Sequence, residues 1–371
     1  MTYARARLWL GISGVGIMVL VSIITLWSNW PHRIFDGFEQ NIVHDSLGLA
    51  WIVALYAAIH IPLDYIGGYW LPCHYSRQCL VFSYFASQYI RGLLVQSLFF
   101  IVSGTILLQV GRTGGRGAAL LFLATLMLLM IELQDRLAAF VAGLKISGEE
   151  SRDGRRVLMF SGMDSGFSGG LAGLPGRERV VVPSIWRRML PQSALDATLE
   201  RRYAALATGA RLRGLLVAMG WNLVGFYLSS TLPAAGVSTL AELFTTALYF
   251  TFWSFLGLLL LPTLSRFGVY ELDQFARRHG MSENEFVLTV RELDQLQDDE
   301  PKRSMGVEAI FHPVPSVESR IERFRGDWRR LGAWNAARYA LFLSWPCLGF
   351  LNRAVHCNSG RPELWVMLPV D

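Results

Sequence analysis

Few side chains in this sequence are spaced for metal binding or for nucleophilic catalysis. Imidazoles at positions i and i+4 lie on one face of a helix, where both can bind the same metal ion. No two histidines here have that spacing, and neither a Gly-x-Ser-x-Gly elbow nor a Gly-x-x-x-x-Gly-Lys loop is present. The seven histidines are His32, His44, His60, His74, His279, His312 and His356.

Two weaker groupings of polar side chains leave alternatives open. His60 and Asp64 are four residues apart, which suits a proton relay or a ligand pair, or else a polar pair at a membrane interface. Cys73, His74 and Cys79 could be a fragment of a metal site, although their spacing matches no known zinc pattern. The alternative for these cysteines is isolated buried or interfacial thiols.

Three segments, taken together, resemble a known family. They read LPQSALDATLERRYAAL (190–206), SRFGVYELDQFA (265–276) and IFHPVPSVESRI (310–321). They are similar to the multi-pass membrane zinc metallopeptidases that include the CAAX prenyl proteases and the heat-shock protease HtpX. In that family the first segment ends in H-E-x-x-H, the second carries E-x-x-x-D, and the third resembles THPP-x-x-E-R-I. The resemblance implies a mainly α polytopic membrane protein with six or seven transmembrane helices and a cytoplasmic gluzincin-like α+β subdomain.

The metal-binding positions of this family are altered in the present chain. In the family's register the first histidine falls on Arg201, the glutamate on Arg202, the second histidine on Ala205 and the third ligand on Val269. A guanidinium stays protonated at accessible pH, so it is neither a metal ligand nor a general base. The resemblance therefore implies a degenerate member with no zinc, no other cofactor and no catalytic residue.

Other family positions are retained and suggest a vestigial groove at Asp273, His312 and Arg320. In the family the equivalent of Asp273 orients a metal-binding histidine. We predict that Arg201 or Arg202 reaches Asp273, so that an ion pair replaces the metal bridge, with Val269 filling the remaining space by apolar packing. His312 is expected to hold its loop against the helices.

Local patterns predict the elements that surround these positions. RVVVPSI (179–185) predicts a strand beside the degenerate helix, equivalent to the family's substrate-pairing edge. Ser193 and Asp196 form an S-x-x-D pattern that predicts a capped helix start. Glu271 lies two positions from Val269, about 200° around a helix, and is expected to be ordinary surface.

Long apolar runs must hold these segments in a membrane. Hydrophobic residues make up 52% of the 371 residues, and the mean hydropathy is +0.34. A final apolar stretch, 333–351, contains Arg338, so the sequence leaves open whether it spans. The other predicted spans are 8–27, 47–71, 92–110, 117–134, 213–232 and 239–262.

Charge predicts the topology rather than a nucleic-acid partner. The net charge is +5, and arginines concentrate near the N-terminus and in the block 135–211. By the positive-inside rule the N-terminus and the protease-like segments are cytoplasmic. We therefore expect a multi-pass protein of a bacterial cytoplasmic membrane.

This reading divides the chain into five parts. The N-terminal membrane domain of four helices covers 1–134, and the first protease-like segment, with the degenerate helix, covers 135–211. Two transmembrane helices follow at 212–262, and a second protease-like segment at 263–330. A hydrophobic helix and tail form 331–371.

The resemblance and the altered positions favour a pseudopeptidase. Such a protein would act as a binding, scaffold or regulatory subunit, with the lipid bilayer and another membrane protein or peptide segment as partners. The alternative is an active membrane protease of the CAAX or HtpX type with a non-standard site. A transporter or channel is a third class, which the absence of repeats disfavours. Zinc analysis of the purified protein separates the first two.

Overall fold

Five long apolar helices form one half of the molecule. The computed structural model describes residues 1–77, 79–152, 155–162, 166–297 and 300–367. Within them, five helices are long and apolar enough to cross a membrane. They are α1 (Tyr3–Trp27), α3 (Ile42–Tyr65) with its continuation through η1 (Ile66–Trp70) and α4 (Leu71–His74), α5 (Phe82–Glu132), α9 (Ala210–Ser230) and α10 (Leu240–Arg278). Short α2 (Trp30–Phe35) follows α1.

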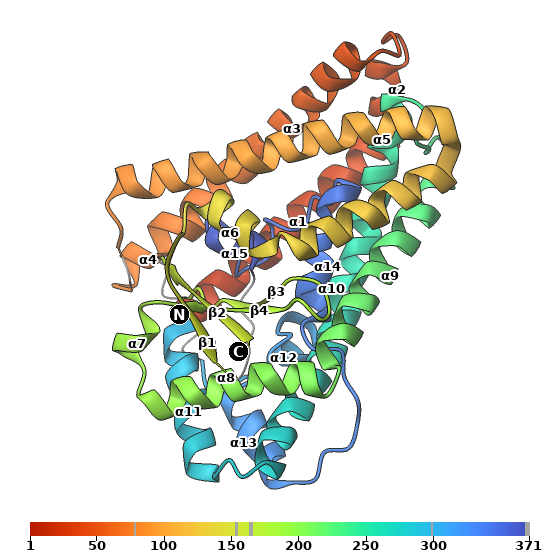
Figure 1. Ribbon diagram of the computed structural model, residues 1–371. Coiled ribbons are helices and arrows are strands. Elements are labelled where there is room, and N and C mark those ends of the chain that lie inside the picture. The colour runs from red at the N-terminus through yellow and green to blue at the C-terminus, as the bar shows by residue number, and fades with distance from the viewer. Residues whose placement is uncertain (78, 153–154, 163–165, 298–299, 368–371) are drawn as a thin grey trace.

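Helix α5 contains two of the predicted spans. A straight helix of its 51 residues would be about 76 Å long, more than twice the roughly 30 Å of a hydrocarbon core. Gly115 interrupts it with φ 66° and ψ −165°, a conformation that favours glycine. Figure 1 shows the chain turning back between two legs of α5. The legs contain the predicted spans 92–110 and 117–134.

A small sheet begins the other half of the molecule. After α6 (Gln134–Ala142) come β1 (Lys145–Arg152), β2 (Arg155–Ser161), β3 (Gly170–Ala172) and β4 (Arg179–Pro183). Their order is β1-β2-β4-β3, with β2 and β4 parallel and the other neighbours antiparallel. The predicted strand 179–185 is confirmed as β4. It lies between β2 and β3, however, so the expectation of an edge strand is wrong.

Short helices complete this half of the molecule. They are α7 (Trp186–Met189), α8 (Gln192–Ala207), α11 (Glu283–Gln297), α12 (Met305–Phe311) and α13 (Val317–Arg325). Helix α11 packs against α8, and α12 and α13 pack against α10. The capped start predicted for α8 is wrong in detail: Ser193 lies inside the helix, and Asp196 accepts a hydrogen bond from Gln192 at 3.0 Å. Pro191 precedes the helix and starts it instead.

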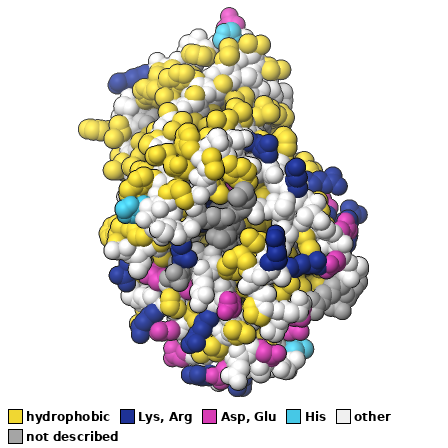
Figure 2. Space-filling model, turned by 90° about the vertical axis from the view of Figure 1, so that its left-hand side faces the viewer, with side chains coloured by type: hydrophobic (Ala, Val, Ile, Leu, Met, Phe, Trp, Pro, Cys, Tyr) yellow, Lys and Arg dark blue, Asp and Glu magenta, His cyan; other side chains and the backbone are white. Residues whose placement is uncertain are grey.

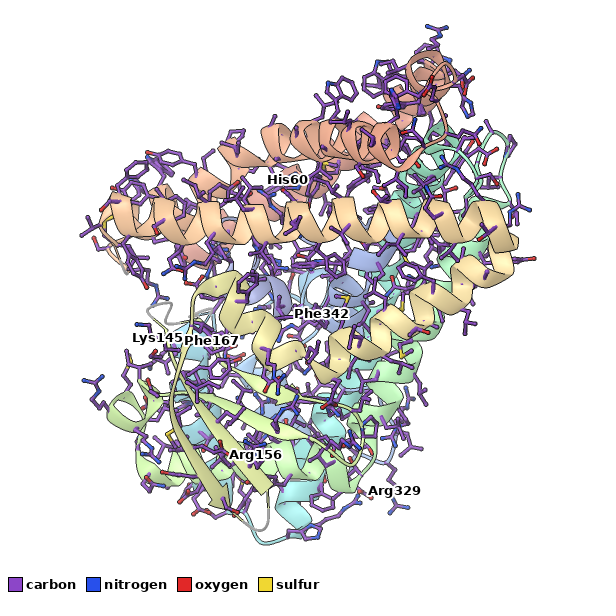
Figure 3. All side chains as sticks on the ribbon, turned by 45° about the horizontal axis from the view of Figure 1, so that its top comes forward. His60, Lys145, Arg156, Phe167, Arg329 and Phe342 are labelled. Atoms are coloured by element: carbon purple, nitrogen blue, oxygen red, sulfur yellow. A yellow bond between two sulfur atoms is a disulfide. The ribbon has the colours of Figure 1, made fainter. Side chains whose placement is uncertain are left out.

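The C-terminal segment, defined as residues 333–367, is almost wholly buried. It contains α14 (Ala336–Leu343), η2 (Trp345–Cys347) and α15 (Glu363–Val366), joined by turns. The stretch 333–351 therefore does not form a membrane-length helix. Pro346 follows the end of α14, and Leu348 turns the chain with φ 55°. In Figure 3 the labelled Phe342 of α14 lies within the helical half.

Two helical glycines let the C-terminal segment approach closely. A Cβ on Gly11 of α1 would lie 2.5 Å from the backbone nitrogen of His356. A Cβ on Gly67 of η1 would lie 2.7 Å from the carbonyl oxygen of Ser359. Both distances are too short for any larger residue without backbone movement. The bundle is thus shaped around its own C-terminal segment.

The surface divides in the same way as the fold. Figure 2 shows hydrophobic side chains over one half of the molecule, and basic and acidic side chains together over the other. Lys145, Arg156 and Arg329 lie in the half with the sheet, and His60 lies among the long helices (Figure 3).

The turn after α4 corrects one expectation from the sequence. Cys73 and Cys79 form a disulfide, so they are neither isolated thiols nor metal ligands. Cys347 and Cys357, both in the described part of the chain, are not disulfide-bonded. The pairing was missed because cysteine spacing alone does not determine connectivity.

Candidate functional site

Asp273 on α10 joins three helices through its carboxylate. Arg201 of α8 donates from Nε to Asp273 Oδ1 at 2.8 Å. Arg320 of α13 donates from Nε to Oδ2 and from Nη2 to Oδ1, both at 3.0 Å. The prediction that Arg201 or Arg202 reaches Asp273 is confirmed, with Arg201 as the partner. The second arginine on the carboxylate was not predicted.

This cluster is removed from solvent. Arg201 and Asp273 are each 1% exposed, and Arg320 is 3% exposed. Breaking a buried pair by removing one partner costs about 3–5 kcal/mol, because a charge is left without compensation. The Arg320 guanidinium also lies over the Phe286 ring, 5.5 Å from its centroid, which adds a cation–π contact. Together these contacts fix α13 and α8 against α10.

Arg202 points away from Asp273 and toward the sheet. Its two terminal nitrogens donate to the carbonyl oxygens of Val181 at 2.7 Å and Ser168 at 2.6 Å. The guanidinium also lies 5.4 Å from the Trp186 ring centroid. Arg202 is fully buried, so carbonyl dipoles and an aromatic face replace water around its charge. Its role is to hold α8 against β4.

Ala205 and Val269 occupy an apolar cluster between α8 and α10. They are 0% and 1% exposed, and Trp334 of the C-terminal segment belongs to the same cluster. The predicted apolar packing of Val269 is therefore confirmed. Trp334 is anchored by its backbone, which donates to Ala210 O at 3.2 Å.

The donor chemistry of this cluster does not suit zinc. Zinc takes thiolate, imidazole or carboxylate ligands with a free lone pair. Arg201 and Arg202 bring fixed positive charge, and Ala205 and Val269 bring no donor atom. Both oxygens of Asp273 already accept from guanidinium groups. Among the described residues, no group of three or more His, Cys, Asp or Glu side chains is placed to hold a metal ion.

His312 contacts the C-terminal segment. It ends α12, is 5% exposed, and its ring lies 5.1 Å from that of His356. The expected role in packing the loop agrees with this position. Of the three residues assigned to a vestigial groove, Asp273 and Arg320 bind each other directly.

Glu271 is not ordinary surface, contrary to the sequence expectation. Both of its carboxylate oxygens accept from Arg213 of α9 at 2.7 Å, and Oε2 also accepts from the backbone nitrogen of Gly332 at 2.9 Å. It therefore joins α9 and α10 to Gly332, the residue just before the C-terminal segment. Glu271 lies about 200° around the helix from Val269, and its side chain points toward α9 rather than toward solvent.

The His60–Asp64 pair marks a second buried cluster. Both residues are fully buried, so the interfacial reading is wrong. Asp64 forms a buried ion pair with Arg353 of the C-terminal segment, accepts from Tyr89 Oη at 3.1 Å, and accepts from Gly360 N at 2.7 Å. His60 instead bonds Tyr56 O at 3.1 Å. Arg353 was missed, although an arginine in the apolar run GFLNRAV was a visible signal.

Comparison with solved structures identifies the fold. The crystal structure of Ste24p from S. mikatae matches with a TM-score of 0.68, 11% sequence identity and coverage of 82% of each chain. The fold is that of Ste24p. With the apolar helices, this similarity makes the chain a polytopic membrane protein with an α+β subdomain, as the sequence predicted. No family model and no curated protein matches the sequence.

Proposed function

We propose that this protein is a catalytically inactive homologue of the membrane metallopeptidases, acting as a binding or regulatory subunit for another membrane protein. Ste24p is a membrane zinc metallopeptidase of the CAAX protease type. The three segments of this sequence resemble the same family, and the fold agrees with them. The protein shares the scaffold but has a different set of side chains at the metal-binding positions.

The arrangement around Asp273 carries this proposal. Hydrolysis of a peptide by this family needs a metal-activated water and a carboxylate base. In this chain Arg201 occupies the position of the first ligand and binds the carboxylate of Asp273. Arg202 occupies the position of the base and is held by two backbone carbonyls. Both side chains therefore have structural partners that fix them in non-catalytic roles.

The C-terminal segment gives independent support. Trp334 packs in the same apolar cluster as Ala205 and Val269. Further along, Arg353 and Gly360 anchor the segment to Asp64. The C-terminal segment thus packs against the altered positions at Trp334 and is anchored at Asp64, which favours a role in binding over hydrolysis. The arginine distribution favours the cytoplasmic side of the membrane for the N-terminus and the sheet. The Cys73–Cys79 disulfide lies close to the N-terminus, through the contact of Tyr75 with Tyr3, and favours an oxidising compartment instead.

Quantitative membrane proteomics of cells lacking this chain tests the proposal. A subunit that shields a partner predicts that one or a few membrane proteins become less abundant, and that the parent chain restores them. The Asp273→Asn variant, in which the Arg201 pair is broken, should restore them less well. An active protease predicts the opposite result: a membrane protein that accumulates at its uncleaved mass and returns to its processed form with the parent chain.

A further inference from the structure

An apolar groove runs between α1 and α10 on the side of the bundle. Its volume is about 430 Å³, within the range of roughly 300–1,000 Å³ that is usual for ligand sites. The walls include Val15 and Gly16 of α1 and Leu258 and Pro262 of α10. The C-terminal segment forms the floor, and the end of α12 closes one end.

The groove lies where lipid chains would meet the protein. Both α1 and α10 are long and apolar enough to cross a membrane, and Val15, Gly16 and Leu258 are partly exposed. On α1 the lining runs from Leu8 to Gly16, which is about 12 Å along the helix axis. That length is close to one leaflet of a hydrocarbon core that is roughly 30 Å thick.

Charge is concentrated at one end of the groove. Arg338 of α14 and His356 line it, and none of the described lining residues is Asp or Glu. Arg338 is partly exposed, whereas its neighbours on α14 are buried. His356 lies beside the start of α1, where Arg7 donates to its carbonyl oxygen.

The apolar walls alone would not select a ligand. A lipid chain gains no hydrophobic free energy on moving from the bilayer to the groove, because the surrounding lipid is equally apolar. Selectivity must therefore come from the polar end. Basic pockets between membrane helices bind anionic lipid head groups, with about 1 kcal/mol for each basic residue near the surface. One arginine then corresponds to a preference of roughly fivefold.

We propose that this groove binds one anionic phospholipid, with an acyl chain between α1 and α10 and the phosphate against Arg338. The inference does not depend on whether the protein is a peptidase. It assigns a lipid site that includes residues of the C-terminal segment, so bound lipid also stabilises the packing of that segment.

Native mass spectrometry of the full chain tests this site. The protein is released from micelles holding equal amounts of dioleoyl phosphatidylglycerol and dioleoyl phosphatidylcholine. We expect one retained phosphatidylglycerol per chain, with about a fivefold preference over phosphatidylcholine. In Arg338→Gln the preference should fall to about one. Equal retention of the two lipids by the parent chain would overturn the proposal.

A matched pair of glycine variants locates the lipid. A Cβ on Gly16 in the groove, or on Gly220 on the exposed face of α9, would meet no atom within 4 Å, so both tolerate a larger residue. Gly16→Leu should fill the groove and abolish retention, while Gly220→Leu should retain lipid as the parent does. Equal retention by the two variants would place the lipid elsewhere and overturn the assignment. Retention of added oleate in place of phospholipid would also overturn it.

Discussion

Arg201 donates from Nε to Asp273 Oδ1 over 2.8 Å, and this bond joins α8 to α10 at positions 1% exposed to solvent. In the register taken from the family resemblance, Arg201 stands at the position of a metal ligand and Asp273 is a retained acid. Under the proposal of an inactive homologue, this ion pair makes the cross-link between the two helices that a metal would otherwise make.

Removing the acid should destabilise the protein strongly. Asp273→Asn leaves the guanidinium groups of Arg201 and Arg320 buried against a neutral amide, at a cost of about 3–5 kcal/mol. Thermal unfolding in detergent measures the change. Asp327→Asn is the matched control, because Asp327 pairs with Arg278 and Arg329 at the surface. This variant should unfold at the same temperature as the parent. Equal unfolding temperatures for the two variants would show that the Asp273 cluster is not structural.

The Asp64–Arg353 pair should control how firmly the C-terminal segment is held. Asp64→Leu leaves the Arg353 charge fully buried, and we expect a loss of about 3–5 kcal/mol and faster proteolysis within residues 333–367. The double variant Asp64→Leu, Arg353→Leu removes both charges and should recover part of that loss. Limited proteolysis followed by mass spectrometry gives the cleavage sites. A double variant cleaved as fast as the single one would contradict this account.

Because Gly11 lies close to the backbone of His356, this position should not tolerate a larger side chain. A Cβ there would lie 2.5 Å from His356 N, so Gly11→Val must displace the C-terminal segment and cost about 1–3 kcal/mol. Gly220→Val is the control, since a Cβ there meets nothing within 4 Å and Gly220 is exposed. Unfolding in detergent compares the two. If the two variants unfold at the same temperature, the C-terminal segment does not pack against α1 as described.

The disulfide between Cys73 and Cys79 predicts a simple labelling result. Under denaturing conditions without reductant, only Cys347 and Cys357 should react with a maleimide, which gives two labels per chain. After reduction the count should rise to four. Four labels without reductant would show that the bond is absent in the isolated protein.

The helical body and the altered positions were predictable from local signals. Apolar runs of membrane length predicted α1, α3, both legs of α5, α9 and α10, because hydropathy acts within one segment. The register of one helix and one acid was enough to predict that Arg201 or Arg202 pairs with Asp273, and Arg201 is the partner. The motif around Arg201 on α8 and the motif around Asp273 on α10 were the two signals on which this prediction depended.

The remaining contacts depend on distant parts of the chain. Arg353 meets Asp64 across a separation of 289 residues. Each charge is visible within its own apolar run, but no local pattern indicates that the two residues pair. The stretch 333–351 has the composition of a span, yet it folds as short pieces because the bundle offers it a glycine-lined interior. Arg320 was identified as a retained position, but its bidentate bond to Asp273 depends on how α13 packs.

Elemental analysis of zinc in the purified full-length protein, with a peptidase assay on the same sample, tests the central claim most directly. The account predicts far less than one zinc per chain and no cleavage that a chelator removes. One zinc per chain, lost together with peptidase activity on chelation, would contradict it.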